Sequence, residues 1–553
     1  METRRRKHWG WGYEHEQPAP AQLREQGAAA VAYLGFGQQE VEMPLPLEDV
    51  KLPQPRVQPP AALAEICDGE IHTRASHALG KSYCDVVKGF RGQFAHPPDF
   101  VASPRDELEI EALLEWCEAE RVAAIPYGGG TSVVGGVEPK VPARCNGAIS
   151  IDLLAMEGLL EVDQVSRAAR IRAGTTGPAV EAALAQHDLT LRHFPQSFEL
   201  STLGGWIATR AGGHFATLWT HIDEMVESVR AIAPAGVWES RRLPGSGAGP
   251  SPDRMLIGSE GALGVITEAW VRVLPRPGFR AQAGVRFVDF DAGAQCVKQI
   301  SQADLHPANC RLIDPVEAGI TGAGDGRHAL LVLGFESADH SVQTLIDRAL
   351  AICAEHGGEW DQVKRSTPGP GARQPRGAGG AVSTWRDAFM QAPYMRDMLV
   401  AAGVLCETFE TATTWERFDQ LHERVSAAAV EAISQTTGVA CGPAHGEAHL
   451  TRRFTHIYPD GPAIYYTVLA PAARGEEVAQ WQTIKAAVSD ALIEQGATIT
   501  HHHAVGRDHR PWYDRQRPDL FAAALRGAKA QLDPRGIMNP GVLIDSLPAN
   551  GAS

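Results

Sequence analysis

The sequence predicts an α+β fold that is divided into two or more domains. Strand and helix patterns follow one another between Phe100 and Ile125 and end at a glycine-rich loop. A second region of mixed strand and helix patterns follows Pro275. The chain of 553 residues also exceeds the size at which a single hydrophobic core stops growing. No internal repeat is evident.

The composition is that of an ordinary soluble globular protein, with 44% hydrophobic and 21% charged residues. No stretch reaches the roughly 18 to 20 uninterrupted apolar residues of a membrane span. The formal net charge of −15 disfavours nucleic-acid binding, because acidic surfaces repel phosphate backbones. The nine cysteines are scattered without a C-x-x-C pair, which favours reduced thiols over a disulfide framework or a structural zinc site. We therefore expect a cytoplasmic protein with no nucleic-acid partner.

Residues 1–92 are interpreted as an N-terminal arm and connector. The basic run from Met1 to Lys7 is followed by Trp9 and Trp11 and lacks the apolar core of a secretory signal. Residues 43–60 hold many prolines and few periodic apolar positions, which is typical of an extended connector. The arm is expected to be floppy or docked on the body, and a peripheral membrane contact through its basic cluster and tryptophans is the alternative.

A first domain is predicted over residues 93–277. Its patterns indicate strands at 100–102, 122–125, 148–154 and within 161–172, and a helix at 177–186. Another helix is predicted to open at 103–106, with apolar positions Leu108, Ile110, Leu113, Leu114 and Cys117. A cap or substrate domain is predicted over 278–530, with a strand at 287–290, a helix at 292–303, a strand at 329–334 and a flexible Gly/Pro-rich loop at 366–380. Residues 531–553 are expected to return to the first domain.

The glycine-rich loop is the first candidate binding site. It comprises Pro126, Tyr127, Gly128, Gly129, Gly130, Thr131 and Ser132. Glycines let backbone N–H groups approach a phosphate closely, and the two hydroxyls add donors for its oxygens. A plain glycine turn is the alternative for this segment taken alone.

Three further segments raise the significance of this loop. They contain Gln196, Ser197, Phe198, Glu199, Leu200, Ser201 and Thr202; Thr209, Arg210, Ala211 and Gly212; and Glu260, Gly261, Ala262, Leu263, Gly264, Val265 and Ile266. In this order the four segments resemble the flavin-binding domain of the vanillyl-alcohol oxidase superfamily. The resemblance implies a PCMH-type FAD-binding domain of two subdomains, a ferredoxin-like-type α+β cap domain and non-covalently bound FAD. It also implies that Ile266 binds the adenine side through its backbone, whereas Glu260 is either a cofactor contact or a structural residue of the turn.

Residues 70 to 545 resemble the alkyldihydroxyacetonephosphate synthase family within this superfamily. The resemblance rests on Arg311 in Cys310-Arg-Leu-Ile-Asp314, Arg396 in Pro393-Tyr-Met-Arg-Asp397, Tyr465 in Ala463-Ile-Tyr-Tyr-Thr467, and His501, His502 and His503. It implies that Tyr465 removes the C1 proton of the substrate and that the histidines assist the leaving group and the incoming alcohol. It also implies that Arg396 binds the substrate phosphate and that Arg311 positions the site near the flavin. We expect the imidazoles to lower the phenol pKa of Tyr465.

Two ambiguities remain in this assignment. Tyr466 follows Tyr465, and strand alternation allows only one of them to face the flavin. Three adjacent histidines in a strand place at most two side chains in one cavity, so no metal site is expected there. His445 and His449 are kept as a secondary metal candidate, because some flavin hydroxyacid dehydrogenases carry a metal-binding motif rich in histidine.

The resemblance implies an enzyme that exchanges the acyl group of acyl-dihydroxyacetone phosphate for a long-chain alcohol, with redox-neutral use of FAD. The implied partners are a lipid-like small molecule and a second copy of the chain in a homodimer, with a possible membrane-peripheral contact. The alternative is an FAD-dependent D-2-hydroxy acid dehydrogenase or oxidase, in which a histidine takes the hydroxyl proton. A flavin-binding protein without enzyme activity is a third hypothesis, which polar residues over the cofactor disfavour.

Overall fold

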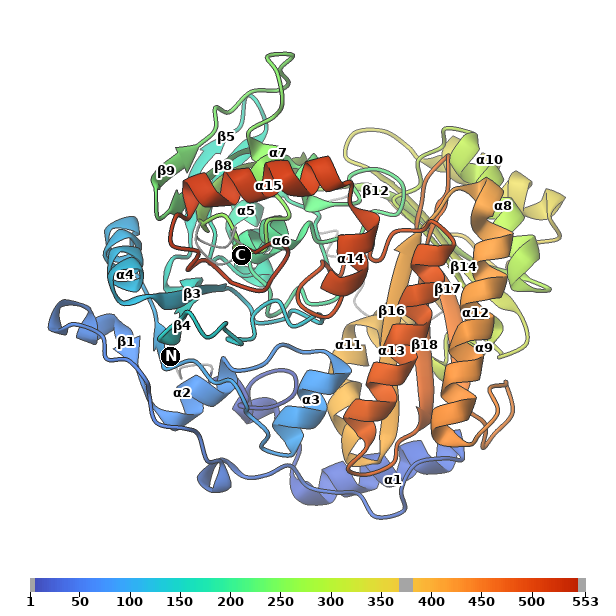
Figure 1. Ribbon diagram of the computed structural model, residues 1–553. Helices are drawn as coiled ribbons and strands as arrows, with labels where there is room; N and C mark the ends of the chain where they lie inside the picture. Colours follow the sequence, from blue (N-terminus) through green and yellow to red (C-terminus); the bar gives the residue numbers. More distant parts are fainter. Residues whose placement is uncertain (1–4, 368–380, 546–553) are drawn as a thin grey trace.

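The computed structural model describes residues 5–367 and 381–545 and has the predicted α+β architecture. Two smaller sheets and their helices form one half of the molecule, and a large sheet covered by helices forms the other half (Figure 1). Most of the Gly/Pro-rich loop predicted at 366–380 lies outside the described residues. Within the described part of the chain, no helix combines the length and the apolar character needed to cross a bilayer.

The first half holds a four-stranded and a five-stranded sheet, in the strand orders β1-β2-β4-β3 and β5-β6-β10-β8-β9, and a small pair of β7 and β11. Its strands are β1 (Cys67–Asp68), β2 (Phe100–Ala102), β3 (Val122–Tyr127), β4 (Gly147–Asp152), β5 (Leu159–Asp163), β6 (Ala168–Arg172), β7 (Leu189–Thr190), β8 (Val226–Ala233), β9 (Gly236–Glu239), β10 (Val265–Arg272) and β11 (Leu274–Pro275). Its helices are α2 (Ile71–Ser76), α4 (Glu107–Glu120), α5 (Gly177–Ala185), α6 (Leu203–Thr209) and α7 (Asp253–Leu256), whereas α1 (Pro20–Leu34) and α3 (Tyr83–Phe90) pack against the second half. Short 3₁₀ turns cover Glu14–Glu16, Leu47–Asp49, Ala61–Ile66, Leu153–Ala155 and Ile222–Glu224.

The predicted strand–helix–strand unit is confirmed as β2, α4 and β3. The Asp106 carboxylate accepts a hydrogen bond from the Glu109 amide and caps the start of α4, and Arg121 ends the helix in the left-handed conformation. Four of the five predicted apolar positions are buried, but Leu108 is 74% exposed, because it lies one residue outside the buried stripe of the helix. Strands β2 and β3 both run parallel to β4, which lies between them. This arrangement delivers the glycine loop at the carboxyl end of β3.

The second half, here called the cap, is built on a seven-stranded sheet in the order β15-β12-β14-β13-β17-β18-β16. Its strands are β12 (Phe279–Phe287), β13 (Asn309–Ile313), β14 (Ala329–Ser337), β15 (Lys364–Ser366), β16 (Val404–Ala412), β17 (His449–Ile457) and β18 (Pro462–Pro471). Its helices are α8 (Phe290–Gln302), α9 (Pro315–Ile320), α10 (Gln343–Glu355), α11 (Ala381–Ala401), α12 (Trp415–Thr437) and α13 (Glu477–Glu494). All neighbouring strands are antiparallel.

The two faces of the cap sheet pack against different helices. Along β14, Leu331 and Leu333 belong to the large core beneath helices α8, α10, α12 and α13, which lie over one face of the sheet (Figure 1). The alternate residues Leu330 and Val332 belong to a second cluster with Trp385 of α11 on the opposite face. This alternation follows from the two-residue period of a strand. The face that carries α11 is turned toward the glycine loop.

Several predicted boundaries are wrong in detail. The predicted strand at 287–290 ends at Phe287, because the Asp289 side chain caps α8 by accepting a hydrogen bond from the Ala292 amide. The predicted strand region 161–172 is two antiparallel strands, β5 and β6. Residues 1–92, interpreted as an arm and connector, include β1, which pairs with β2 of the first half.

The N-terminal turn docks between the two halves, and the C-terminal helix docks on the first half. Trp9 and Trp11 are both buried, so these side chains are not available for the membrane contact considered above. At the other end, α14 (Arg510–Gln516) and α15 (Asp519–Leu532) follow the cap. The buried Lys529 ammonium of α15 donates hydrogen bonds to the carbonyls of Ala262 and Met538, and Met538 bridges to β3. Helix α15 therefore packs on the first half, although the sequence placed it in the cap.

Candidate functional site

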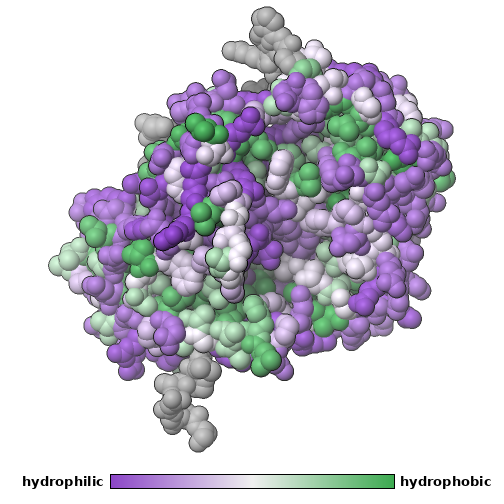
Figure 2. Space-filling view, turned by 90° about the horizontal axis from the view of Figure 1, so that it is seen from above, coloured by the Kyte–Doolittle hydropathy of each residue, from purple (hydrophilic) through white to green (hydrophobic). Residues whose placement is uncertain are grey.

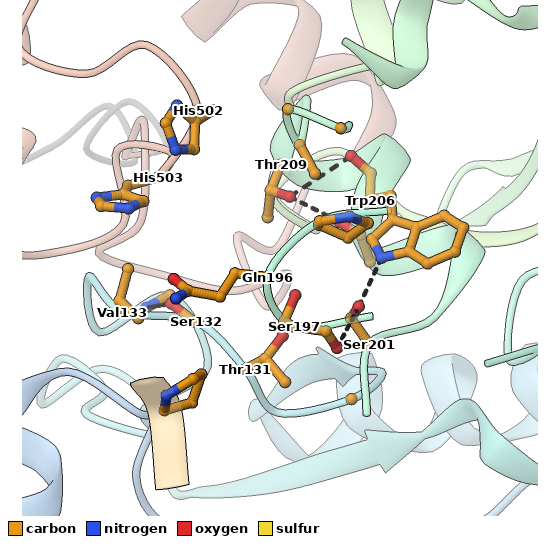
Figure 3. A pocket seen from close by; sticks show the side chains of 18 of the residues that line it. Thr131, Ser132, Val133, Gln196, Ser197, Ser201, Trp206, Thr209, His502 and His503 are labelled. Carbon is orange, nitrogen blue, oxygen red and sulfur yellow. Dashed lines mark hydrogen bonds between the residues drawn. The ribbon is translucent and has the colours of Figure 1, made fainter. Parts of the chain in front are cut away.

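A cavity of about 320 Å³ lies where the glycine loop meets the α11 face of the cap sheet. Loops from both sheets of the first half form one wall, and side chains of β13, β17, β18, α11 and the histidine run form the other. Figure 3 shows His502 and His503 across the cavity from Thr131, Ser132 and Val133, with Gln196 between them. Most of the predicted cofactor residues and most of the predicted catalytic residues therefore line one cavity.

The glycine loop packs directly on the turn at 197–202. A Cβ atom at Gly128 would lie 2.4 Å from Thr202 Oγ1, and one at Gly129 would lie 2.2 Å from the Leu200 carbonyl oxygen. Gly130 has a φ of +65°. No side chain fits at these positions, which leaves the backbone of the loop open toward the cavity. This cradle fits a phosphate-bearing cofactor, and the hydroxyls of Thr131 and Ser132 line it.

The second cofactor segment is held by its own hydrogen bonds. The Thr202 side chain caps α6 by accepting from the Gly205 amide, and the Trp206 indole N–H donates to Ser201 Oγ at 2.6 Å (Figure 3). The Thr209 hydroxyl donates to the Gly205 carbonyl at 2.8 Å. These bonds fix the wall that faces the glycine loop.

Most of the predicted cofactor residues line the cavity. They are Pro126, Tyr127, Gly128, Gly129, Gly130, Thr131, Ser132, Gln196, Ser197, Ser201, Thr202, Thr209, Ala211, Gly212, Glu260, Gly261, Gly264 and Ile266. Seven others lie outside its lining, namely Phe198, Glu199, Leu200, Arg210, Ala262, Leu263 and Val265. Among these, Glu199 accepts a hydrogen bond from Tyr394, and Arg210 pairs with Asp223.

Glu260 connects the first half to the histidine run. Its buried carboxylate accepts hydrogen bonds from the amides of Val505 and Gly506 at 2.9 and 2.8 Å. Burial raises the pKa of this carboxyl to about 7, although both hydrogen bonds act in the opposite direction. This geometry supports the structural interpretation of Glu260.

The three histidines form a bend and not the predicted strand. The buried Glu410 carboxylate of β16 organises this bend, because it accepts hydrogen bonds from the Thr500 hydroxyl and from the amides of all three histidines at 2.6 to 3.1 Å. His502 and His503 line the cavity, whereas His501 lies outside its lining and contacts the Tyr458 hydroxyl at 2.7 Å. At most two of the three histidines were expected to face one cavity; two line it, through a bend and not through strand alternation.

Burial makes these imidazoles weak bases. It lowers the pKa of His502 to about 3, and it holds the pKa of His503 well below its usual value despite the nearby Glu410 carboxylate. Both rings are therefore neutral at pH 7. A neutral imidazole can relay a proton, because it accepts one at one nitrogen while it donates one from the other.

Tyr465 faces the cavity, and Tyr466 faces the opposite side of the sheet. Tyr466 is fully buried and its hydroxyl bonds His422 Nδ1 at 2.9 Å. The Tyr465 ring stacks with His502 at a centroid distance of 6.0 Å. Its register partners on the two neighbouring strands are Glu410 and Arg453. The strand period thus resolves the choice between the two tyrosines.

The predicted lowering of the Tyr465 pKa is wrong. Burial raises the pKa of this phenol, and the attraction of Arg453, whose guanidinium carbon lies 3.9 Å from the ring centroid, only partly offsets the rise. The neighbouring imidazoles are neutral and contribute no compensating charge. Tyr465 is therefore a phenol at neutral pH.

Three arginines line the cavity, and the sequence predicted two of them. Arg396 of α11 donates to the Lys81 carbonyl at 2.6 Å, and Arg311 of β13 stacks over Trp385 and Phe389 at about 5 Å. Burial lowers the pKa of Arg311 to about 9, with a further contribution from Arg453. The Nε atoms of all three arginines are buried without a hydrogen-bond partner. Such buried cations with free donors fit an anionic ligand.

Arg453 and His456 of β17 are the main cavity residues that the sequence analysis missed. Arg453 pairs with Glu317 at 2.6 Å, and His456 leaves its Nε2 atom buried without a partner. His456, His501 and His502 hold their ring nitrogens within 4.8 Å of one another and are the one such group of three found among residues 5–367 and 381–545. His445 and His449 instead bond backbone carbonyls at Ala32 and Gly442. The secondary metal candidate is therefore not brought together by the fold.

The comparisons with known proteins agree with this geometry. Residues 98–240 match the FAD binding domain family, and residues 276–543 match the family of FAD linked oxidases, C-terminal domain. An alkyldihydroxyacetonephosphate synthase of Dictyostelium discoideum is 30% identical over 503 residues, which cover 86% of this chain and 78% of the relative. A solved alkyldihydroxyacetonephosphate synthase structure matches with a TM-score of 0.77 and 25% identity over 97% of this chain and 98% of that chain.

The fold is also shared with a protein of much lower sequence identity. A solved p-cresol methylhydroxylase structure matches with a TM-score of 0.65 at 13% identity, over 87% of this chain and 94% of that chain, which shows a shared fold. The two family matches and the synthase structure confirm the predicted PCMH-type FAD-binding architecture and FAD as the cofactor. This chain belongs to the alkyldihydroxyacetonephosphate synthase family of FAD-dependent enzymes.

Proposed function

We propose that the protein exchanges the acyl group of acyl-dihydroxyacetone phosphate for a long-chain alcohol. The observation that carries this proposal is the meeting of Tyr465, His502 and His503 with Arg311, Arg396 and Arg453 in one cavity that the flavin cradle opens into. The exchange needs proton-transfer groups for C1, for the departing carboxylate and for the incoming alcohol, and it needs fixed cations for a phosphate dianion. The cavity supplies both sets.

The atoms of this reaction balance without net oxidation. One proton leaves C1 of the substrate, the bond between C1 and the acyl oxygen breaks, and a carboxylate departs. The alcohol oxygen then forms the new bond to C1 and gives up its proton, while C1 regains a proton. The bound flavin supplies the electron sink that makes the departure of the carboxylate feasible.

The proton steps are assigned to neutral groups. Because burial holds His502 and His503 uncharged, their imidazoles accept the proton of the incoming alcohol and return a proton to C1. Tyr465 remains the candidate base at C1. Since its pKa is raised, it must pass its own proton onward as it accepts the C1 proton, and the stacked His502 ring is the adjacent acceptor.

The phosphate is assigned to the arginines on the α11 side. Arg396 has one guanidinium nitrogen bound to a carbonyl and its Nε unpaired, so it retains donors for phosphate oxygens. Arg311 and Arg453 add positive charge on the cap sheet. The role of Arg311 as a positioning residue near the flavin belongs to the same proposal.

The test is mass spectrometry of the purified flavoprotein incubated with palmitoyl-dihydroxyacetone phosphate and ¹⁸O-labelled hexadecanol. We expect the label in an alkyl ether product and release of one palmitate per ether. Absence of the ether, together with flavin bleaching by a D-2-hydroxy acid, would refute the proposal and favour the dehydrogenase.

Assembly and location complete the proposal. We infer a homodimer from the family resemblance and a cytoplasmic location from the nine cysteines, all of which have free thiols in the structure.

The face seen in Figure 2 is largely hydrophilic with scattered apolar areas. A membrane-peripheral contact is supported instead by the exposed Leu520 and Phe521 at the start of α15. Sedimentation with phospholipid vesicles tests this contact, and loss of sedimentation in Phe521→Ser is the expected result.

A further inference from the structure

The N-terminal residues 5–13 form a tight turn wedged between the glycine loop and helix α11. Arg6 and Tyr13 face each other across an antiparallel bridge, and the Lys7 amide bonds the Gly12 carbonyl. Gly10 and Gly12 both have positive φ, at +65° and +92°. The turn is anchored by Trp9, whose ring packs edge-on against Phe90 at 5.3 Å.

One side of the turn binds the glycine loop. The Arg6 guanidinium donates to the Gly128 carbonyl at 2.8 Å, lies 5.2 Å from the Tyr127 ring centroid and is 3.8 Å from the Asp152 carboxylate. Arg6 therefore fixes the turn to the wall of the flavin cradle.

The other side of the turn binds α11 at Asp397, the residue after the cavity arginine Arg396. The Trp11 amide donates to both Asp397 carboxylate oxygens at 3.1 and 2.9 Å, and the Lys7 ammonium donates to one of them at 3.3 Å. All three residues are buried. A Cβ atom at Gly10 would lie 2.4 Å from this carboxylate, so the contact requires glycine there. The Trp11 side chain itself lines the cavity.

Arg396 is held from a second direction by the same part of the molecule. Its guanidinium donates to the Lys81 carbonyl, and the Lys81 amide bonds the Ser132 carbonyl of the glycine loop. The direction of the Arg396 side chain thus depends on where α11 is pinned. A buried carboxylate that accepts three hydrogen bonds from two donors of the N-terminal turn pins the helix at the adjacent residue.

We propose that the turn of residues 5–13 positions Arg396 for the substrate phosphate by holding Asp397 through Lys7 and the Trp11 amide. This inference rests on the proposed function, in which Arg396 binds that phosphate. Lys7 and Asp397 are positioning residues and touch neither substrate nor flavin. The N-terminal segment is on this account part of the phosphate site.

The test compares Lys7→Met and Asp397→Asn in the full-length flavoprotein, with Arg5→Met as the matched control because Arg5 is an exposed cation of the same turn. We expect the KM for palmitoyl-dihydroxyacetone phosphate to rise about tenfold in both variants, with kcat and flavin content close to wild type and a lowered Tm, because each variant leaves one member of a buried ion pair without its partner. Lys7→Met is the safer variant, because Asp397 keeps the two hydrogen bonds from the Trp11 amide. Arg5→Met should change nothing.

A double variant separates positioning from general destabilisation. In an Arg396→Met background, Lys7→Met should change KM by less than about twofold, because the group it positions is gone. The inference would be overturned if Lys7→Met raised KM in the Arg396→Met background as much as in the wild type. It would also be overturned if both single variants of an active enzyme kept the wild-type KM. Either result would leave the proposed function standing.

Calorimetric titration with inorganic phosphate gives a readout that needs no turnover. We expect about tenfold weaker phosphate binding in Lys7→Met than in the wild type. If the wild type made no ether, the proposed function would fail while this titration still decided the positioning role; equal phosphate affinities would refute it.

Discussion

Glu410→Gln is the substitution that most sharply probes the histidine bend. Glu410 Oε1 accepts from the Thr500 hydroxyl and from the amides of His502 and His503, and Oε2 accepts from the His501 amide at 2.6 Å. A glutamine places an NH₂ group at one of these oxygens. The less costly orientation places the new NH₂ group at the Oε2 position. There it faces the His501 N–H, so that one hydrogen bond to the carboxylate is lost and two donors point at each other.

The size of the effect follows from this count. A hydrogen bond to a charged group contributes roughly 1.5 to 3 kcal/mol, so we expect Glu410→Gln to lower the free energy of unfolding by about 2 kcal/mol. The bend that carries His502 and His503 should shift, and kcat should fall by at least about tenfold. Flavin binding should persist, because the cradle lies on the opposite wall.

The assay is urea denaturation, a flavin absorbance spectrum and ether formation measured on the same preparation. Glu423→Gln on the exposed side of α12 is the matched control and should leave all three unchanged. Wild-type stability and kcat in Glu410→Gln would refute the conclusion that this carboxylate organises the bend. Loss of FAD alone would place its main effect on the cradle instead.

Four further predictions follow from the site. Tyr465→Phe should retain the flavin spectrum and lose hydrogen exchange at C1, measured by NMR in D₂O, whereas Tyr466→Phe should retain both; exchange in the first variant would place the base elsewhere. The folded-state pKa of His502 is about 3 against 6.5 when unfolded, so the unfolded state binds more protons below pH 6.5 and stability falls as pH falls toward 3. His502→Gln should therefore reduce the stability lost between pH 7 and pH 5 in urea titrations by about 2 kcal/mol, and an unchanged pH profile would contradict the buried neutral state. Gly129→Ala should yield protein with little flavin, judged from the ratio of flavin to protein absorbance, whereas Gly527→Ala, with open space around it, should not. Dialysis against EDTA should leave turnover unchanged, because two of the three clustered histidines already bond each other at 3.1 Å; loss of activity restored by zinc would reverse this assignment.

Local patterns in the sequence were sufficient for the cradle. Each of these features depends on residues within a few positions of one another. This holds for the cap of α4, for strand β3 and for the glycine loop, and the structure places all three as predicted. The same applies to Tyr465 and Tyr466, whose opposite orientations follow from the strand period alone.

Local sequence patterns could not predict which residues are brought together by the pairing of distant strands. Glu410 and Arg453 flank Tyr465 because β18 lies between β16 and β17, and no local signal in either strand marks them as partners. The error on the Tyr465 pKa has the same origin, since the expectation counted the imidazoles and omitted the burial of the phenol. The histidine bend was taken for a strand because the carboxylate that caps it lies some ninety positions away.

The N-terminal turn shows the same limit in a different form. The basic run and the two tryptophans suggested an arm or a membrane contact, but their partners, Asp397 and Phe90, are supplied by distant segments.

The central claim is that this flavoenzyme works without net oxidation, and counting product molecules per flavin under anaerobic conditions tests it most directly. With palmitoyl-dihydroxyacetone phosphate, hexadecanol and no electron acceptor, we expect many ether molecules per flavin and an oxidised flavin spectrum at the end. Product formation that stops after one equivalent, with the flavin left reduced, would contradict it.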